Sequence, residues 1–486
     1  MFKYILLLFS LLSIIFTDDN FHRSCALTSD QYRSRPSLDT YAISPSNHFF
    51  IHYDLEGFNA PDLIDQYGMD SNAPNNIPDY IDEVALIADQ VRDILVNQMN
   101  FLSEAADEDG VYDIYIKNKS NYNYGINIPD NTINGGELSY PNASYIEIDN
   151  EYEPGAYYTS GLNTMRLVVA HEFFHAIQRA YSSPQSGHTY FWEMTATWIE
   201  DIIVPDGNDY MFWVDDFFEN PNVNISATDG YSIALFGHYL SNVIAAGDNT
   251  IIREIWENYS SNNNNPLSSI ETVLESNYQT NFQKSWTDFC SRNFFNGLYG
   301  NMNNNIYFHI DQINLLPIQS FANSLSNYEL INENLLISDF ILTSSSSKNL
   351  SYIVDDFSKV IIDSSPSDQV EGFISILSDN SYYQHIYMNN DIQEIYLAPE
   401  DKFFLSYSKY NNGLIDIDIE YLSNFIFTIG DCNLDQNINI LDLVLLVDLI
   451  FSDSVIIDTQ FSNSDINSDN TLNIFDAILL IDLILN

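Results

Sequence analysis

The chain has 486 residues, 45% of them hydrophobic, which excludes wholesale disorder. Its 68 acidic residues against 16 Lys and Arg residues leave a formal net charge of −52, which argues against binding nucleic acid or anionic membrane surfaces and suits divalent cations. The three cysteines, Cys25, Cys290 and Cys432, allow at most one internal disulfide, so the chain is not a disulfide-stapled scaffold.

The first 17 residues have the pattern of a secretory signal peptide. Lys3 precedes an apolar run over residues 4–16, which is too short for a comfortable membrane span. A buried N-terminal helix is the alternative, but the extreme N-terminal position and the basic start favour a signal. We therefore expect a secreted, extracellular protein without a membrane span.

Residues 18–320 are predicted to form one α+β domain, with strands early and helices late. The patterns predict strands at residues 48–55, 111–116 and 145–148, and helices at 78–100, 164–181, 191–203, 231–244 and 251–259. The asparagine-rich stretches 262–265 and 301–305 are predicted to be loops.

Residues 324–425 have a hydrophobic period of two. Short segments rich in β-branched and aromatic residues alternate there with Ser, Asn and Asp clusters. This spacing predicts an all-β sandwich accessory domain.

The strongest chemical motif is His171-Glu172-Phe173-Phe174-His175. Two His at i and i+4 lie on one face of a helix, where both rings can aim at one metal ion. Glu172 is placed to reach a metal-bound water. The third ligand must come from elsewhere, and Glu193 on the next predicted helix is favoured over His188, which lies in a polar loop. Two core histidines bonded to their neighbours would be the alternative to a metal site.

The HEFFH motif followed by WEMTATWIED resembles the gluzincin class of zinc metallopeptidases. More closely, the chain resembles a family of secreted bacterial HExxH peptidases over about residues 48–260, including the segments FFIHYD, NNIPDYIDEV, YIEIDNEY, DGYSIALFGHYL and IIREIWENY. The resemblance implies a zincin-like fold, zinc at His171, His175 and Glu193, and Glu172 as the catalytic base of an endopeptidase. Met194 departs from the family pattern, because Gly is expected after the ligand Glu.

A peptidase also needs a donor for the oxyanion that develops during hydrolysis. Tyr231 is the first candidate and His238 the second, with ordinary helix packing as the alternative for both. Glu200 and Asp201 could orient the ligating histidines as hydrogen-bond acceptors, or could simply be solvated. The Asp- and Asn-rich stretch 70–79 could hold a calcium ion, although such residues are common in turns.

The C-terminal segment contains an internal repeat of two 12-residue loops, each followed by an apolar helix. Loop positions 1, 3, 5, 9 and 12 carry Asp, Asn, Asp, Asn and Asp, a spacing of oxygen ligands that can wrap one Ca²⁺, with a backbone carbonyl at position 7. The repeat resembles a type I dockerin, a calcium-dependent module that docks onto cohesin domains. The resemblance implies as calcium ligands Asp431, Asn433, Asp435, Asn437, Asn439 and Asp442 in the first loop, and Asp465, Asn467, Asp469, Thr471, Asn473 and Asp476 in the second.

Two departures from the dockerin pattern bear on this interpretation. Loop position 6 is Gln436 and Asn470, where Gly is usual, and Asn tolerates a left-handed backbone better than Gln does. Residues 440–441 and 474–475 are apolar where many dockerins carry polar recognition residues. A cohesin-like protein is the partner that the resemblance implies, and a purely structural calcium module is the alternative.

The leading hypothesis is a secreted zinc endopeptidase with a signal peptide (1–17), a catalytic domain (18–320), a β-sandwich (324–425) and a dockerin-like docking module (428–486) that tethers it to a partner or surface. A non-catalytic surface or adhesion protein on a degenerate peptidase scaffold is the alternative. Glu172 argues against that alternative, because a structural zinc site needs no general base. A sandwich that binds glycan and directs the peptidase to glycoproteins is a third possibility.

Overall fold

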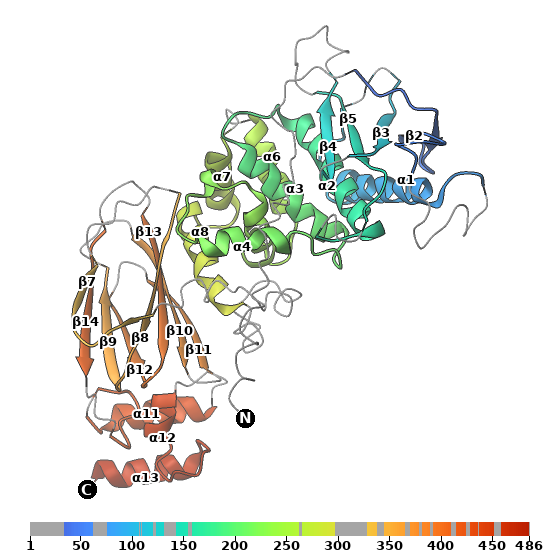
Figure 1. Cartoon of the computed structure of the whole chain (residues 1–486). Coiled ribbons are helices and arrows are strands. Elements are labelled where there is room, and N and C mark those ends of the chain that lie inside the picture. Colours follow the sequence, from blue (N-terminus) through green and yellow to red (C-terminus); the bar gives the residue numbers. More distant parts are fainter. Residues whose placement is uncertain are drawn as a thin grey trace, which may run out of the picture. The chain divides into compact units, whose positions relative to one another are not determined.

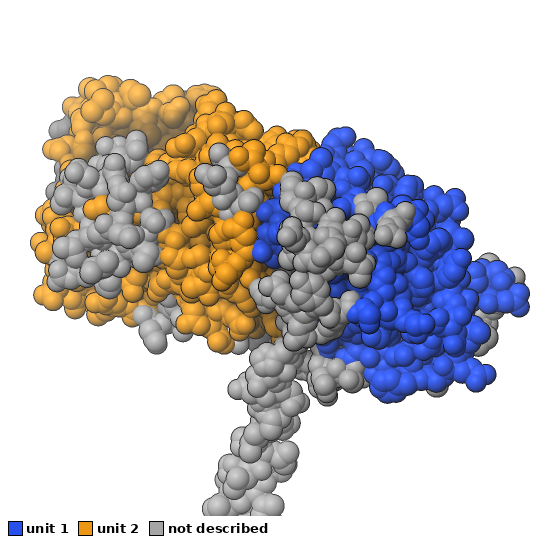
Figure 2. All heavy atoms as spheres, turned by 90° about the horizontal axis from the view of Figure 1, so that it is seen from above, with its two compact units in different colours: residues 1–184, 199–209 blue, residues 185–198, 210–486 orange. Residues whose placement is uncertain are grey.

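The computed structural model describes residues 34–61, 75–105, 107, 109–119, 123–130, 142–153, 158–261, 265–296, 328–337, 345–364, 370–378, 382–388, 392–409, 415–423, 428–435, 437–451 and 458–485. Four sequence predictions lie wholly or partly outside these ranges: the signal peptide, Cys25, Gln436 and residues 70–74 of the stretch 70–79. The chain divides into two compact units, residues 1–184 with 199–209 and residues 185–198 with 210–486 (Figure 2). The boundary between the units falls within helix α3 (Thr189–Ile203). This division does not test the predicted domains 18–320, 324–425 and 428–486, which stay predictions.

The first unit is built on a mixed five-stranded sheet with the order β1-β2-β3-β5-β4 (Figure 1). The strands are β1 (Thr40–Ile43), β2 (Phe49–Tyr53), β3 (Tyr112–Lys117), β4 (Gly125–Pro129) and β5 (Ser144–Asp149). The inner strands β2, β3 and β5 are parallel, whereas β1 and β4 pair antiparallel at the two ends of the sheet. Strands β3 and β5 are buried almost throughout, as expected for parallel strands covered on both faces.

Two helices of the first unit pack on this sheet. Helix α1 (Asp79–Arg92) continues as a π-helical segment (Asp93–Gln98), and helix α2 (Gly161–Tyr181) packs on α1, β4 and β5. The sequence predicted α1, α2, β2, β3 and β5, but not the outer strands β1 and β4. Strand β1 is short and mostly exposed, and β4 begins with Gly125 and ends with Pro129, two residue types that are depleted in strands.

The second unit begins with helices. They are the first part of α3, then α4 (Met211–Glu219), α5 (Ala234–Tyr239), α6 (Thr250–Ser261), α7 (Pro266–Asn277) and α8 (Phe282–Arg292). The single helix predicted at 231–244 changes its hydrogen-bond pattern twice, from 3-10 (Tyr231–Ile233) to α and then to π (Leu240–Ile244). Helices α4 and α8 were not predicted, and neither was α7. Its N-cap is Asn265, the last residue of the asparagine run, whose side chain accepts from Ser268 N.

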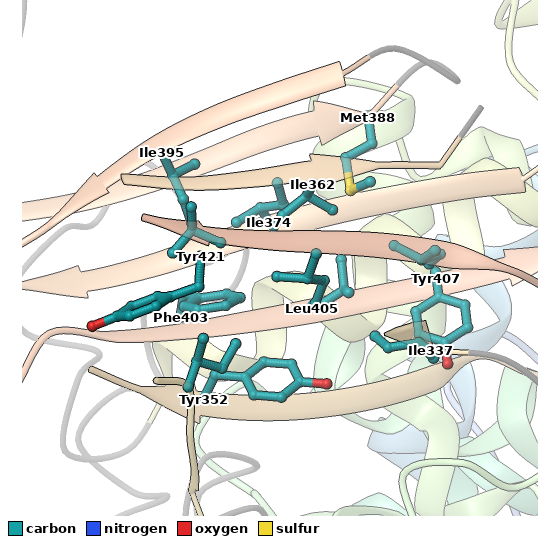
Figure 3. Close-up of a cluster of buried hydrophobic side chains, with 14 of the residues drawn as sticks. Ile337, Tyr352, Ile362, Ile374, Met388, Ile395, Phe403, Leu405, Tyr407 and Tyr421 are labelled. Atoms are coloured by element: carbon teal, nitrogen blue, oxygen red, sulfur yellow. The ribbon is translucent and has the colours of Figure 1, made fainter. Parts of the chain in front are cut away.

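A two-sheet β region follows the helices. It contains β6 (Glu329–Leu330), β7 (Leu335–Ile337), β8 (Lys348–Ile353), β9 (Ser358–Asp363), β10 (Val370–Ser378), β11 (Tyr382–Met388), β12 (Ile392–Leu397), β13 (Lys402–Lys409) and β14 (Ile417–Ser423). The strand orders are β11-β10-β13-β8-β6 and β12-β9-β14-β7. Both sheets contribute to one apolar core that includes Ile362, Ile374 and Leu405 (Figure 3). The described residues thus confirm an α+β region followed by a β-rich region.

The C-terminal module, residues 428–485 as described, contains α11 (Ile440–Phe451), α12 (Asp458–Ser464) and α13 (Ile474–Leu485). Helices α11 and α13 contact each other around a small core with Cys432, Leu446 and Leu480. Cys290 and Cys432 are both buried free thiols. Within the ranges that the structure describes, no helix is both long enough and apolar enough to cross a membrane.

Candidate metal centre

Helix α2 places the HEFFH motif in the interior of the protein. Almost all of its side chains are buried, including His171, Glu172 and His175. The helix begins after Ser160, which has an extended backbone, and ends at Ser182, which is extended again. Pro184 follows, and proline cannot continue a helix. A long buried helix with defined ends is a rigid support for two side chains one turn apart.

The Nε2 atoms of the two histidine rings face one another. His171 Nε2 lies 3.0 Å from His175 Nε2. The opposite nitrogens each lie 2.6 Å from an oxygen, His171 Nδ1 from Glu200 Oε1 and His175 Nδ1 from Gln178 Oε1. A carboxylate and an amide oxygen are acceptors, so each Nδ1 carries the proton and each Nε2 presents a lone pair.

This arrangement fits a divalent metal ion. Two converging nitrogen lone pairs repel, and a cation that both coordinate removes the repulsion. A tetrahedral zinc ion, bound at about 2.0–2.1 Å, holds two nitrogens about 3.3 Å apart, close to the observed separation. Glu193 of α3 completes the set, because one ligand atom from each of the three residues lies within 4.8 Å of the others. Among the described residues, this is the one group of three His, Cys, Asp or Glu side chains that meets this criterion.

Glu193 is held by close packing within the second unit. Gly230 has a φ of +98°, and a Cβ added there would lie 2.7 Å from Glu193 Cβ and 2.4 Å from Tyr190 O. The turn before Tyr231 therefore packs directly on the backbone of α3 at the ligand. Trp256 Nε1 donates to Thr195 Oγ1 over 3.3 Å, two residues further along the helix.

Glu172 is as deeply buried as the other acidic groups of the site. It is 2% exposed, and its Oε2 has no hydrogen-bond partner in the part of the chain that is described. Its side chain packs against Gly125 of β4, since a Cβ on that residue would lie 2.9 Å from Glu172 Cγ. A buried carboxylate oxygen without a donor is costly in a purely structural role and is suited to accepting a proton.

The other sequence candidates have different surroundings. His188, the alternative third ligand, has its Nδ1 3.0 Å from Tyr259 OH, and burial lowers its pKa. Tyr231 is buried, with its ring 5.5 Å from that of Trp213. His238 is buried near Tyr210. Glu200 bonds His171 as expected, and Asp201 is buried beside it in the chain. The oxyanion donor therefore stays a prediction.

Sequence reasoning missed two residues at this site. Gln178 stands three positions after His175, a spacing that places it on the same face of α2, so the pattern could have shown it. Gly125 gave no sequence signal, because nothing local relates β4 to α2.

The two C-terminal loops have the same internal geometry. At loop position 12, Asp442 accepts from the backbone N–H groups of Asn433 and Asn439 at 3.0 and 2.8 Å. Asp476 accepts from the equivalent positions of the second loop at 3.2 and 2.9 Å. Asn470 has a φ of 61°, the left-handed conformation expected at position 6. In both repeats, two N–H groups of the loop thus hold the carboxylate at position 12 in the same way.

Comparison with known protein families identifies one match. Residues 65–320 match the model described as "Family of unknown function (DUF6055)", which covers more than half of the chain. The chain therefore belongs to this family, and the matched region contains strands β3, β4 and β5 of the sheet together with α2 and α3. No curated protein matches the chain.

Proposed function

We propose that this protein is a zinc-dependent endopeptidase with a zincin-like catalytic region. The observation that carries the proposal is the convergence of His171 Nε2, His175 Nε2 and a Glu193 oxygen, with the buried Glu172 carboxylate adjacent in sequence to the first ligand. Three protein ligands leave the fourth position of a tetrahedral ion for water or substrate, as in catalytic zinc sites.

The chain's own residues have separate roles in this proposal. Zinc, when bound, supplies Lewis acidity that lowers the pKa of a coordinated water and polarises the scissile carbonyl. Glu172 accepts the proton of the attacking water and passes it to the leaving amine. Glu200 and Gln178 hold the Nδ1 protons of the two histidines, so that both Nε2 atoms remain ligands. Burial excludes bulk water around these groups.

We further propose that the C-terminal module is a dockerin-like calcium-binding unit on a secreted protein. Support comes from the duplicated loop geometry and from the apolar side chains that α11 and α13 expose, such as Val444, Phe451 and Phe475. In this proposal the two loops bind one Ca²⁺ each, and the module attaches the enzyme to a protein partner such as a cohesin. The β-sandwich joins the two regions.

Digestion of casein by the full-length protein tests the catalytic proposal. We expect activity with one zinc per chain, loss of activity with a zinc-selective chelator in the presence of Ca²⁺, and recovery on adding zinc. Glu172→Gln should keep the zinc and lose activity, whereas Glu193→Gln should lose both. Glu147→Gln, a buried carboxylate on β5 that bonds Lys117 and Lys119, is the matched control and should keep both. A Glu172→Gln variant that digests casein at the wild-type rate would refute the mechanism.

A further inference from the structure

Strand β4 packs against the side chain of Glu172 and donates a hydrogen bond to its backbone carbonyl. Gly125 and Asn127 are two residues apart on this strand and so face the same side, toward α2. A Cβ added to Gly125 would lie 2.7 Å from Val168 Cγ1, 2.9 Å from Glu172 Cγ and 3.2 Å from Glu172 Oε1. Its φ is not in the left-handed region, so the backbone would accept any L-residue. Space, not conformation, requires glycine here.

Asn127 holds the same turn of the helix through its amide. Its Nδ2 donates to the backbone carbonyl of Glu172 over 3.2 Å, and its Oδ1 accepts from Arg179 Nε over 2.6 Å. Both Asn127 and Arg179 are buried, Asn127 completely. The Asn127 amide thus bonds α2 at two places, the side chain of Arg179 and the backbone carbonyl of Glu172, the proposed base.

We infer that β4 positions the general base: Gly125 leaves the space into which the Glu172 carboxylate fits, and Asn127 fixes the helical turn that carries it. The inference rests on the proposed function and adds two positioning residues to it. The metal ligands do not depend on Gly125, because its close contacts are to Val168 and Glu172. A methyl group at residue 125 should therefore displace the base without removing the metal.

The size of the effect follows from how proton transfer depends on position. A general base must lie within hydrogen-bond reach of the proton, and a displacement of about 1 Å can cost about 10²-fold in rate. The 2.9 Å contact is several tenths of an ångström shorter than ordinary van der Waals contact, so the Glu172 side chain must move. We expect Gly125→Ala to lower kcat about 10²-fold, with KM and zinc content close to wild type.

A double variant separates this role from a merely structural one. Val168→Ala removes the methyl groups nearest to residue 125, so Gly125→Ala should reduce the melting temperature less in the Val168→Ala background than in the wild-type protein. The clash with Glu172 remains, so the kcat of the double variant should stay about 10²-fold below that of Val168→Ala alone. Gly372→Ala in β10, where a Cβ would meet the flexible Met388 Sδ at 3.2 Å, is the control for adding a methyl group to a strand and should leave kcat unchanged.

The absorption spectrum of the cobalt(II)-substituted protein provides a readout that needs no peptidase activity. In the proposed function Glu172 would accept a proton from a metal-bound water, so Gly125→Ala should shift the cobalt bands while one metal per chain is retained. A double variant that regains wild-type kcat and an unshifted cobalt spectrum would overturn the inference. A wild-type protein that binds metal but digests no protein would refute the proposed function instead, and the cobalt spectra of the variants would still decide the role of Gly125.

Discussion

The side chains of the two proposed zinc ligands His171 and His175 bond acceptors of different charge, and this difference predicts unequal effects on metal affinity. Glu200 and Gln178 each lie 2.6 Å from a histidine Nδ1, so distance does not distinguish them. The side chains of His171 and Glu200 are both completely buried, where solvent does not weaken a charge-assisted hydrogen bond. A hydrogen bond to a charged group contributes about 1.5–3 kcal/mol, and a neutral one about 0.5–1.5 kcal/mol.

Replacing each acceptor with leucine removes the hydrogen bond at similar side-chain volume. Since about 1.4 kcal/mol corresponds to tenfold in affinity, Glu200→Leu should weaken zinc binding about 100-fold and Gln178→Leu about tenfold. Glu200→Gln keeps an acceptor without the charge and should fall between wild type and Glu200→Leu. Competition against a chromophoric zinc chelator measures the three affinities in the full-length protein.

Two controls make the comparison decisive. Circular dichroism of each metal-free variant shows whether α2 is still folded, and Glu147→Gln tests whether the loss of any buried carboxylate weakens zinc binding. Zinc binding by Glu200→Leu as tight as that of wild type, or a larger effect of Gln178→Leu, would contradict this prediction.

Three further predictions concern other parts of the chain. Removal of Ca²⁺ by a calcium-selective chelator should make the C-terminal module sensitive to protease before the rest of the chain. The double variant Asp431→Ala with Asp465→Ala should be sensitive even with Ca²⁺ present, and mass spectrometry of the fragments would show both effects. Equal protease resistance with and without Ca²⁺ would contradict calcium-dependent folding. Burial lowers the pKa of His385, so the folded state favours its neutral form. The stabilising contribution of His385 is therefore complete at neutral pH and declines as the pH falls below about 6.5. His385→Ala should cost about 3 kcal/mol in the free energy of urea unfolding at pH 7.5 and less at pH 5, and an equal cost at both pH values would contradict this. Burial, together with Glu219 and Asp216, raises the pKa of Asp215 to about 6, so its charge destabilises the fold once the pH rises through about 4 to 6. Asp215→Asn should raise the free energy of unfolding by about 1 kcal/mol at pH 7.5, a value already reduced for solvent screening of this half-exposed group. The same variant should be no more stable than wild type at pH 3.5.

Local patterns were sufficient for several elements and insufficient for others. The helix with HEFFH and the strands β2, β3 and β5 have strong hydrophobic periodicity, and the structure places them near the predicted residues. Strand β13 was not predicted, because the central strand KFFLSYSK is buried nearly throughout and so lacks the alternation of a half-exposed strand. Ser408 of this strand faces α8, where its hydroxyl contacts that of Thr287, so this polar residue is buried in the interior.

Helix geometry and repetition fix part of the candidate site in the amino-acid sequence alone. The spacing of His171 and His175 places both rings on one face of any helix, and the duplicated loops carry oxygen-bearing side chains at fixed intervals. The tertiary structure was needed to show that Glu193 and not His188 lies with the two histidines, and that Gly125 lies against Glu172. These contacts join segments that are distant along the chain, and which segments meet depends on how the whole core packs and not on any local periodicity.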